Sequence, residues 1–245
     1  MKSKICVPIP IKSASILEFK TRFEKIIISN PDLIELRYDY INDAQVLTQD
    51  FIKQLLDNIN PKIPVIFTFR NYREGGQMKL DEITRFNILK NLILSQPNYL
   101  DIEMNTEKNH LTEFIELASQ NKVKLIFSHH NFFETPTYEV ISNQIQGFLK
   151  TLKHDFRINS KELDDIILKL IFKAKSFEDN LTSLKLCEEF SKQLKIISFC
   201  MGQLGIFSRV LCVLNGSFLT YGSIIEETAP GQISIKDIRD SLSFF

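Results

Sequence analysis

Residues 33–70 read LIELRYDYINDAQVLTQDFIKQLLDNINPKIPVIFTFR, and this stretch decides the fold class. Residues 33–40 and 64–70 are short β-type runs rich in Ile, Leu and Phe. Between them, apolar residues recur at helical spacing over residues 44–59, and Asp43 stands before them as a favoured helix N-cap. The stretch therefore predicts a strand, a helix and a second strand, the unit that builds parallel sheets.

The same alternation continues in both directions along the chain. Upstream, residues 5–11 predict a strand and residues 13–28 a helix, with Ser13 or Ser15 as its N-cap. Downstream, predicted strands cover residues 99–104, 124–131, 166–173, 195–202 and 218–224. Predicted helices cover residues 81–94, 111–119, 177–193, 206–214 and 233–245, and another opens at Thr135-Pro136.

About eight β–α units in a chain of 245 residues predict an α/β fold, the (β/α)8 TIM barrel. An open doubly wound sheet is the alternative, but it usually has a Gly-rich first turn, and no G-x-G-x-x-G occurs here. No Gly/Ser-rich linker or composition break divides the units. We therefore expect residues 1–245 to form a single catalytic barrel domain.

Composition excludes several classes of protein. With 44% hydrophobic and 24% charged residues, the chain is unlike disordered, collagen-like or coiled-coil sequences. Lys+Arg and Asp+Glu number 30 each, so the formal net charge is zero. A neutral chain has no bulk attraction for nucleic acid or anionic lipid, and we expect no nucleic-acid partner.

Cysteine usage and the N-terminus indicate a cytoplasmic protein. The four cysteines (Cys6, Cys187, Cys200 and Cys212) form no C-x-x-C pair and have no His at zinc spacing, so we expect reduced, packed thiols and no metal site. No apolar run reaches the roughly 18 residues of a membrane helix. The first residues, MKSKICVPIPIK, lack the pattern of a signal peptide. We expect no membrane partner.

Ionisable residues gather at the C-terminal ends of the predicted strands. Alternate residues of a strand share one face, and the active site of a (β/α)8 barrel lies where these ends meet. The residues of one parity are Glu35, Arg37 and Asp39, Thr68 and Arg70, Asp101 and Glu103, Ser128 and His130, and Lys169 and Lys173. Each alone is typical of a rim salt bridge. Together they predict a mouth that binds an anionic or polyhydroxylated ligand, because buried charges are costly without partners.

These residue types favour Schiff-base chemistry. A desolvated lysine is a nucleophile for a substrate carbonyl, and His130 has the right intrinsic pKa to move protons near neutrality. Parity does not choose between Lys169 and Lys173 as the nucleophile. Either lysine is also explained as a neutralising partner of Asp101 or Glu103.

Seven motifs, taken together, resemble the type I 3-dehydroquinate dehydratases. In chain order they are ELRYD (35–39), TFR (68–70) with EGG (74–76), DIE (101–103), SHHNF (128–132), LKLI (168–171), GIFSR (205–209) and TAPGQIS (228–234). Each motif is weak alone, but their order and spacing over most of the chain are specific. The resemblance implies a barrel, often a homodimer, that dehydrates 3-dehydroquinate to 3-dehydroshikimate in the shikimate pathway of aromatic amino acid biosynthesis. It implies a lyase that uses a Schiff base and neither a metal nor an organic cofactor.

The resemblance also implies individual roles. Lys169 falls on the imine-forming lysine, His130 on the general acid–base, and Glu74 on the carboxylate that orients His130. The implied substrate-binding residues are Glu35, Arg37, Arg70, Arg209, Thr228, Gln232, Met201 and Tyr221. Among them, Arg209 matches the arginine that holds the substrate carboxylate, and Gln232 lies in the loop that closes over substrate. His129 has the wrong parity for a catalytic role.

The chain departs from the family pattern at five positions. Phe199 replaces a common Met, Tyr221 a common Phe, Asn131 a common Asp, Thr228 a common Ser and Lys173 an apolar residue. Three other readings compete with the resemblance. A sugar-phosphate aldolase would show a Gly-rich phosphate site after the last strands, whereas the glycines here are dispersed. A non-catalytic binding barrel would have lost the lysine or the histidine, and a structural barrel would not need a charged mouth.

Overall fold

Eight parallel strands form one sheet in the order β7-β6-β5-β4-β3-β2-β1-β8. The computed structural model describes residues 3–224 and 231–245, so Thr228 and most of the predicted closing loop lie outside the described residues. The strands are β1 (Ile5–Pro10), β2 (Leu33–Arg37), β3 (Val65–Thr68), β4 (Tyr99–Glu103), β5 (Lys124–Asn131), β6 (Ile167–Lys173), β7 (Lys195–Met201) and β8 (Thr220–Tyr221). The Phe218 N–H, just before β8, donates to the Ile196 carbonyl of β7 at 2.7 Å, which brings the two edges of the sheet together.

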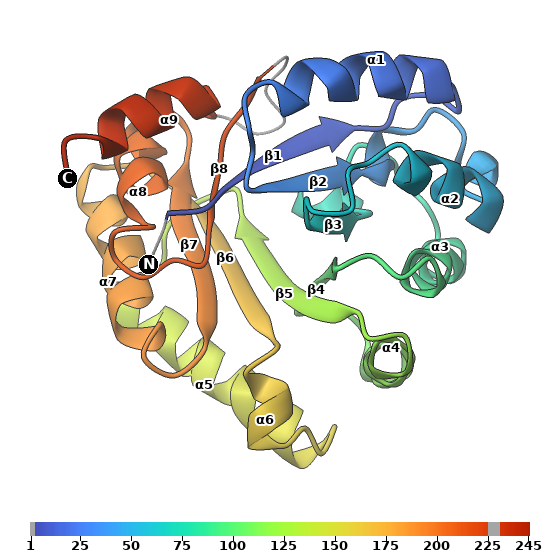
Figure 1. Cartoon of the computed structure of the whole chain (residues 1–245). Coiled ribbons are helices and arrows are strands. Elements are labelled where there is room, and N and C mark those ends of the chain that lie inside the picture. Colours follow the sequence, from blue (N-terminus) through green and yellow to red (C-terminus); the bar gives the residue numbers. More distant parts are fainter. Residues whose placement is uncertain (1–2, 225–230) are drawn as a thin grey trace.

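Helices surround this sheet, as Figure 1 shows. They are α1 (Ile16–Ile27), α2 (Gln49–Asp57), α3 (Glu82–Leu94), α4 (Lys108–Gln120), α5 (Tyr138–His154), α6 (Ser160–Leu163), α7 (Glu178–Phe190), α8 (Ile206–Leu211) and α9 (Ile235–Leu242). Short 3-10 turns are η1 (Tyr38–Tyr40), η2 (Ala44–Val46), η3 (Tyr72–Glu74) and η4 (Gln203–Gly205). Parallel strands with helices between them form a nearly closed (β/α)8 barrel, which confirms the predicted TIM-barrel fold.

Side-chain caps fix where several helices begin. The side chains of Ser15, Thr48, Asp81, Thr137 and Ser234 each accept a hydrogen bond from a backbone N–H in the first turn of the helix that follows. Such bonds satisfy donors that have no partner within the helix. Of the two predicted caps of the first helix, Ser15 is the one used.

The predicted helix over residues 44–59 is wrong as a continuous helix. Asp43 does act as a cap, because its side chain accepts from the Gln45 N–H, but it begins only η2. Leu47 then leaves the helical region at ψ 54°, and Thr48 caps α2 as a second start. Leu47 is 2% exposed, so its burial in the core accompanies the break.

Several other boundaries differ from expectation. The strand predicted over residues 218–224 is only Thr220–Tyr221, and the strand predicted over residues 64–70 ends at Thr68. The helix expected to open at Thr135-Pro136 begins at Tyr138 behind the cap Thr137, and Thr135 Oγ1 instead donates to the Lys173 carbonyl at 3.0 Å. The predicted strand over residues 33–40 ends at Arg37, so Asp39 lies in η1.

The barrel interior changes from apolar to polar along the strands. Towards the N-terminal ends, the interior is filled by Ile66, Ile126, Ile167 and Ile197, all 0% exposed. Nearer the C-terminal ends of the strands, Thr68 pairs in register with Asp101, and Ser128 pairs with both Glu103 and Lys169. The register therefore brings the predicted ionisable residues to one end of the barrel.

Candidate active site

A cavity of about 520 Å³ opens at the C-terminal ends of the strands. Of the eleven predicted site residues, ten are described, and all ten line this cavity. They are Glu35, Arg37, Arg70, Glu74, His130, Lys169, Met201, Arg209, Tyr221 and Gln232. Parallel strand ends place them together although they come from six different β–α units.

Lys169, on β6, lies at the floor of the cavity and is 5% exposed. Its Nζ lies 2.9 Å from Asp101 Oδ2, 3.1 Å from Tyr221 Oη and 3.5 Å from Glu35 Oε1. Glu35 is itself held by the Thr68 hydroxyl, which donates to Oε1 at 2.7 Å. The amine is therefore held in one position between two carboxylates and a phenol.

Asp101 joins Lys169 to Arg70. Its Oδ2 also lies 2.7 Å from Arg70 Nη2, and its Oδ1 accepts from the Ser128 hydroxyl at 2.5 Å. Burial raises the pKa of the Asp101 carboxyl, but the charges of Arg70 and Lys169 outweigh it and hold that pKa well below its usual range. Arg70 further pairs with Glu103 at 2.7 Å, and Glu103 also pairs with Arg85. Buried charges are thus compensated throughout the floor.

His130 and Glu74 meet on one side of the cavity. Glu74 Oε2 accepts the His130 backbone N–H at 2.9 Å and lies 3.3 Å from its Nδ1. Burial raises the pKa of Glu74 to about 7, although Arg70 opposes the rise. Burial, and then the charges of Arg70 and Lys169, lower the pKa of His130 well below its usual value. A neutral imidazole in this setting is a base, and its neighbour fixes the ring.

Glycines hold Glu74 close to the histidine. Gly75 has a left-handed φ of 86°, and a Cβ there would lie 2.3 Å from the Phe132 ring. At Gly76 a Cβ would lie 2.0 Å from the Arg70 carbonyl oxygen. Only glycine fits this turn, which explains the EGG sequence in physical terms.

The cavity wall also includes the buried cation of Arg209. Arg209, on α8, is 1% exposed and its guanidinium carbon lies 4.5 Å from the centre of the Phe199 ring. Gln232 is 4% exposed beside the same cavity. Asp39 fixes the orientation of Arg37, because Arg37 Nε and Nη2 donate hydrogen bonds of 2.8 Å to its two carboxylate oxygens.

Residues 5–245 match the type I 3-dehydroquinase family. The chain belongs to that family. A 3-dehydroquinate dehydratase of Thermococcus onnurineus is 30% identical over 220 residues, which are 89% of this chain and 90% of the relative. Membership confirms the predicted enzyme class, a hydro-lyase of the type I 3-dehydroquinate dehydratases, whose dehydration belongs to the shikimate pathway.

Solved structures of the family have the same fold. The 3-dehydroquinate dehydratase of Geobacillus kaustophilus is 26% identical with a TM-score of 0.84 and covers 100% of this chain and 91% of its own. The type I enzyme of Clostridium difficile, solved with covalent modified comenic acid, has a TM-score of 0.81 at 26% identity and covers 99% and 92%.

Lys173 and His129 do not share the positions of the site residues Lys169 and His130. Lys173 ends β6 but does not line the cavity, and its Nζ would lie 2.8 Å from a Cβ added at Gly202. Geometry therefore favours Lys169 where parity had left the choice open. His129 does not line the cavity, yet its Nδ1 is 3.9 Å from Glu74 Oε1.

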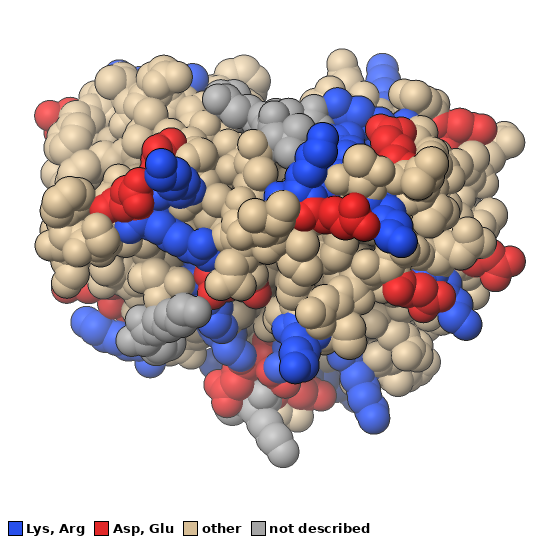
Figure 2. Space-filling model, turned by 45° about the horizontal axis from the view of Figure 1, so that its top comes forward, with Lys and Arg blue, Asp and Glu red and all other residues tan. Residues whose placement is uncertain are grey.

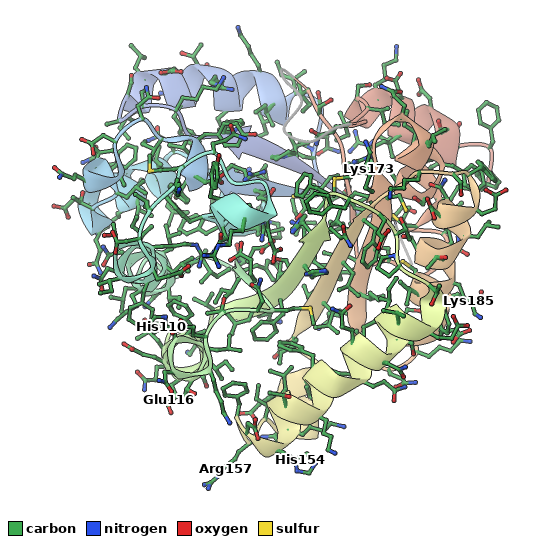
Figure 3. The ribbon with its side chains drawn as sticks, turned by 180° about the vertical axis from the view of Figure 1, so that it is seen from behind. His110, Glu116, His154, Arg157, Lys173 and Lys185 are labelled. Carbon is green, nitrogen blue, oxygen red and sulfur yellow. The ribbon has the colours of Figure 1, made fainter. Side chains whose placement is uncertain are left out.

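Sequence reasoning missed several residues of the cavity wall. Tyr72 and Gln77 line it from the segment around η3, and no strand pattern marked them. Phe132 lines it too, and its place in SHHNF was the available signal. The remaining histidines, His110 and His154, lie on the outer helices α4 and α5, as Figure 3 shows.

Metal clusters, membrane-spanning helices and basic surface patches are the features that other classes of ligand would require. In residues 3–224 and 231–245, no group of three or more His, Cys, Asp or Glu side chains is arranged to hold a metal ion. Within the same ranges, no helix combines the length and apolar character that crossing a bilayer requires. On the face drawn in Figure 2, basic and acidic side chains are interspersed rather than gathered in one basic patch.

Proposed function

We propose that this chain dehydrates 3-dehydroquinate to 3-dehydroshikimate through a Schiff base on Lys169, with His130 as general acid–base and Glu74 orienting it. The observation that supports this most is the convergence of the buried Lys169 amine and the Glu74–His130 pair in one cavity. A cavity of about 520 Å³ suits a cyclic acid of this size.

The chemistry begins with addition. The Lys169 amine forms a bond to the ketone carbon, and loss of water from the carbinolamine gives a protonated imine. The iminium withdraws electrons and acidifies the adjacent C–H. His130 takes that proton, an enamine forms, and a proton returned from His130 lets the hydroxyl leave as water. Hydrolysis of the imine regenerates Lys169 and releases the product.

Binding groups orient the substrate for these steps. Arg209 pairs with the substrate carboxylate, for which the planar guanidinium suits better than an ammonium. Glu35, Arg37 and Arg70 bind hydroxyls or shape the pocket, and Met201 and Tyr221 form the wall. Thr228 and Gln232 belong to the loop that closes over substrate and excludes water.

We also propose a single catalytic domain over residues 1–245 and a homodimer in the cytoplasm that works without a metal or organic cofactor. One sheet that contains all eight strands supports the single domain. Four buried cysteines without a disulfide suit a reducing compartment. The dimer rests on the resemblance alone, and light scattering of the purified chain tests it.

The test of the proposed reaction compares two lysines on one strand. Purified protein is mixed with 3-dehydroquinate, and the conjugated product is followed by its ultraviolet absorbance. We expect turnover by the wild type and by Lys173→Met, and none by Lys169→Met. A folded wild type that does not consume 3-dehydroquinate, or an active Lys169→Met, contradicts the proposal.

A further inference from the structure

The Tyr221 hydroxyl lies against the nitrogen of Lys169. Tyr221 ends β8, where it pairs in register with Cys6 of β1, and it is 5% exposed. Its Oη is 3.1 Å from Lys169 Nζ, and the same Nζ lies 4.5 Å from the centre of the Tyr221 ring. Phe199 supports the ring from the side, with the two ring centres 6.2 Å apart. The phenol is thus fixed on the amine, not merely part of the cavity wall.

The three hydrogen-bond partners of Lys169 are not equivalent. Asp101 and Glu35 are carboxylates, which only accept hydrogen bonds when ionised, whereas a phenol both donates and accepts. An ammonium has three N–H donors, and the three oxygens around Nζ match that number. A neutral amine has two N–H donors and one lone pair. Two carboxylates take the donors, so the third direction, towards Tyr221, is left for the lone pair.

The surroundings keep the phenol protonated, as a donor must be. Burial, and then the charges of Glu35 and Asp101, raise the pKa of Tyr221 well above its usual value, although Arg70 opposes the rise. Glu35 and Asp101 come from β2 and β4, and both also contact Lys169 Nζ, so the two carboxylates and the phenol converge on one nitrogen. The hydroxyl can therefore turn from accepting an ammonium N–H to donating to the amine nitrogen.

We propose that Tyr221 is a positioning residue for Lys169. Its hydroxyl holds Lys169 Nζ in place in both the protonated and the neutral form of the amine and thereby speeds imine formation. The inference rests on the proposed function. In the step concerned, His130 first takes one proton from the Lys169 ammonium. The nitrogen lone pair then forms the N–C bond, the carbonyl π electrons pass to oxygen, and His130 returns the proton to that oxygen. A second proton moves from the nitrogen through His130 to the hydroxyl, which leaves as water as the C=N bond forms, so the iminium nitrogen keeps one N–H. Tyr221 exchanges hydrogen-bond roles during these transfers and is unchanged at the end.

The variant Tyr221→Phe isolates this role, because it removes one oxygen and keeps the ring that packs on Phe199. Enzyme and 3-dehydroquinate are mixed rapidly and quenched with borohydride at successive times, and the reduced adduct is measured by mass. We expect the adduct to form about tenfold more slowly than in the wild type, the effect of one hydrogen bond. Tyr99→Phe, at the opposite end of the barrel, is the matched control and should leave the rate unchanged.

A second readout separates this role from a general packing defect. With substrate deuterated at the carbon that loses its proton to His130, slower imine formation should bring the isotope effect on turnover in Tyr221→Phe to or below its wild-type value. A general packing defect would slow the later steps as well as imine formation. Adduct formation at the wild-type rate in Tyr221→Phe, an equal loss in Tyr99→Phe, or an isotope effect larger than that of the wild type overturns the inference. Absence of any adduct in the wild type would instead refute the proposed function, and this inference with it.

Discussion

Glu74 Oε2 accepts the backbone N–H of His130 at 2.9 Å and lies 3.3 Å from Nδ1 of the same ring. An ionised Glu74 accepts from Nδ1–H and leaves Nε2 free as the base, whereas a protonated Glu74 donates to Nδ1 and places the ring proton on Nε2. The pKa of Glu74, raised to about 7 mainly by burial, therefore decides which tautomer of His130 is present near neutral pH.

The first prediction concerns the pH dependence of the rate. We expect kcat/KM of the wild type to rise with pH through about 7, because the active tautomer needs an ionised Glu74. Glu74→Gln retains an acceptor for Nδ1–H but does not titrate. It should lose this limb of the profile and run about ten- to a hundredfold more slowly at high pH, the effect of a weaker hydrogen bond. A profile from pH 5 to 9 that keeps the same limb in the variant would count against the tautomer account.

The second prediction concerns stability at the same residue. The folded-state pKa of Glu74, about 7, lies above the ordinary value of 4.5, so the folded state binds more protons than the unfolded state between these values. The free energy of unfolding should therefore fall as pH rises from about 4.5 to about 7. Glu74→Gln lacks this loss and should be more stable than the wild type at pH 8, by on the order of 1–3 kcal/mol. Urea unfolding at pH 5 and pH 8 measures the difference, and a gap that does not widen with pH would contradict it.

The third prediction concerns Asp101, which lies between two buried cations. Asp101→Asn leaves Arg70 and Lys169 without their shared carboxylate, and we expect a loss of about 3–5 kcal/mol in the free energy of unfolding. Denaturant titration checks this. Asp81→Asn removes the same charge from an exposed helix cap that Asn also fills well, and it should remain close to the wild type. Equal stability of the two variants would show that the Asp101 charge is not needed at the floor.

The fourth prediction concerns the turn that carries Glu74. Gly75→Ala puts a Cβ at a left-handed φ and against the Phe132 ring, so it should destabilise the protein by roughly 1–2 kcal/mol and raise KM. Gly147→Ala, in α5, meets no atom within 4 Å and should stabilise the protein by about 0.5–1 kcal/mol. Thermal unfolding of both variants measures this contrast. A neutral Gly75→Ala would mean that Phe132 and the turn move freely.

The sequence predicted the order of strands and helices because hydrophobic periodicity and caps are local. It also predicted which ionisable residues share the inner face, since parity is a property of each strand alone. It did not predict the break at Leu47–Thr48, because the burial of Leu47 depends on residues distant in the chain. The sequence also does not show how deep in the barrel a side chain lies. Parity gave Lys169 and Lys173 equal standing, and only the paired strands distinguish the floor from the rim.

Asp101 illustrates the same limit within the site. Its position was predicted on the inner face, but its link between Arg70 and Lys169 depends on the register of β3, β4, β5 and β6. Side-chain contacts of this kind arise from long-range pairing, and no single strand contains the information.

The most direct test of the central claim is covalent trapping of the imine. The full chain is treated with borohydride in the presence of 3-dehydroquinate, digested, and its peptides are weighed by mass spectrometry. The account predicts one stable adduct, on Lys169, and none without 3-dehydroquinate. An adduct on Lys173 would keep the reaction but overturn the site, and a folded sample with no adduct would contradict the Schiff-base mechanism itself.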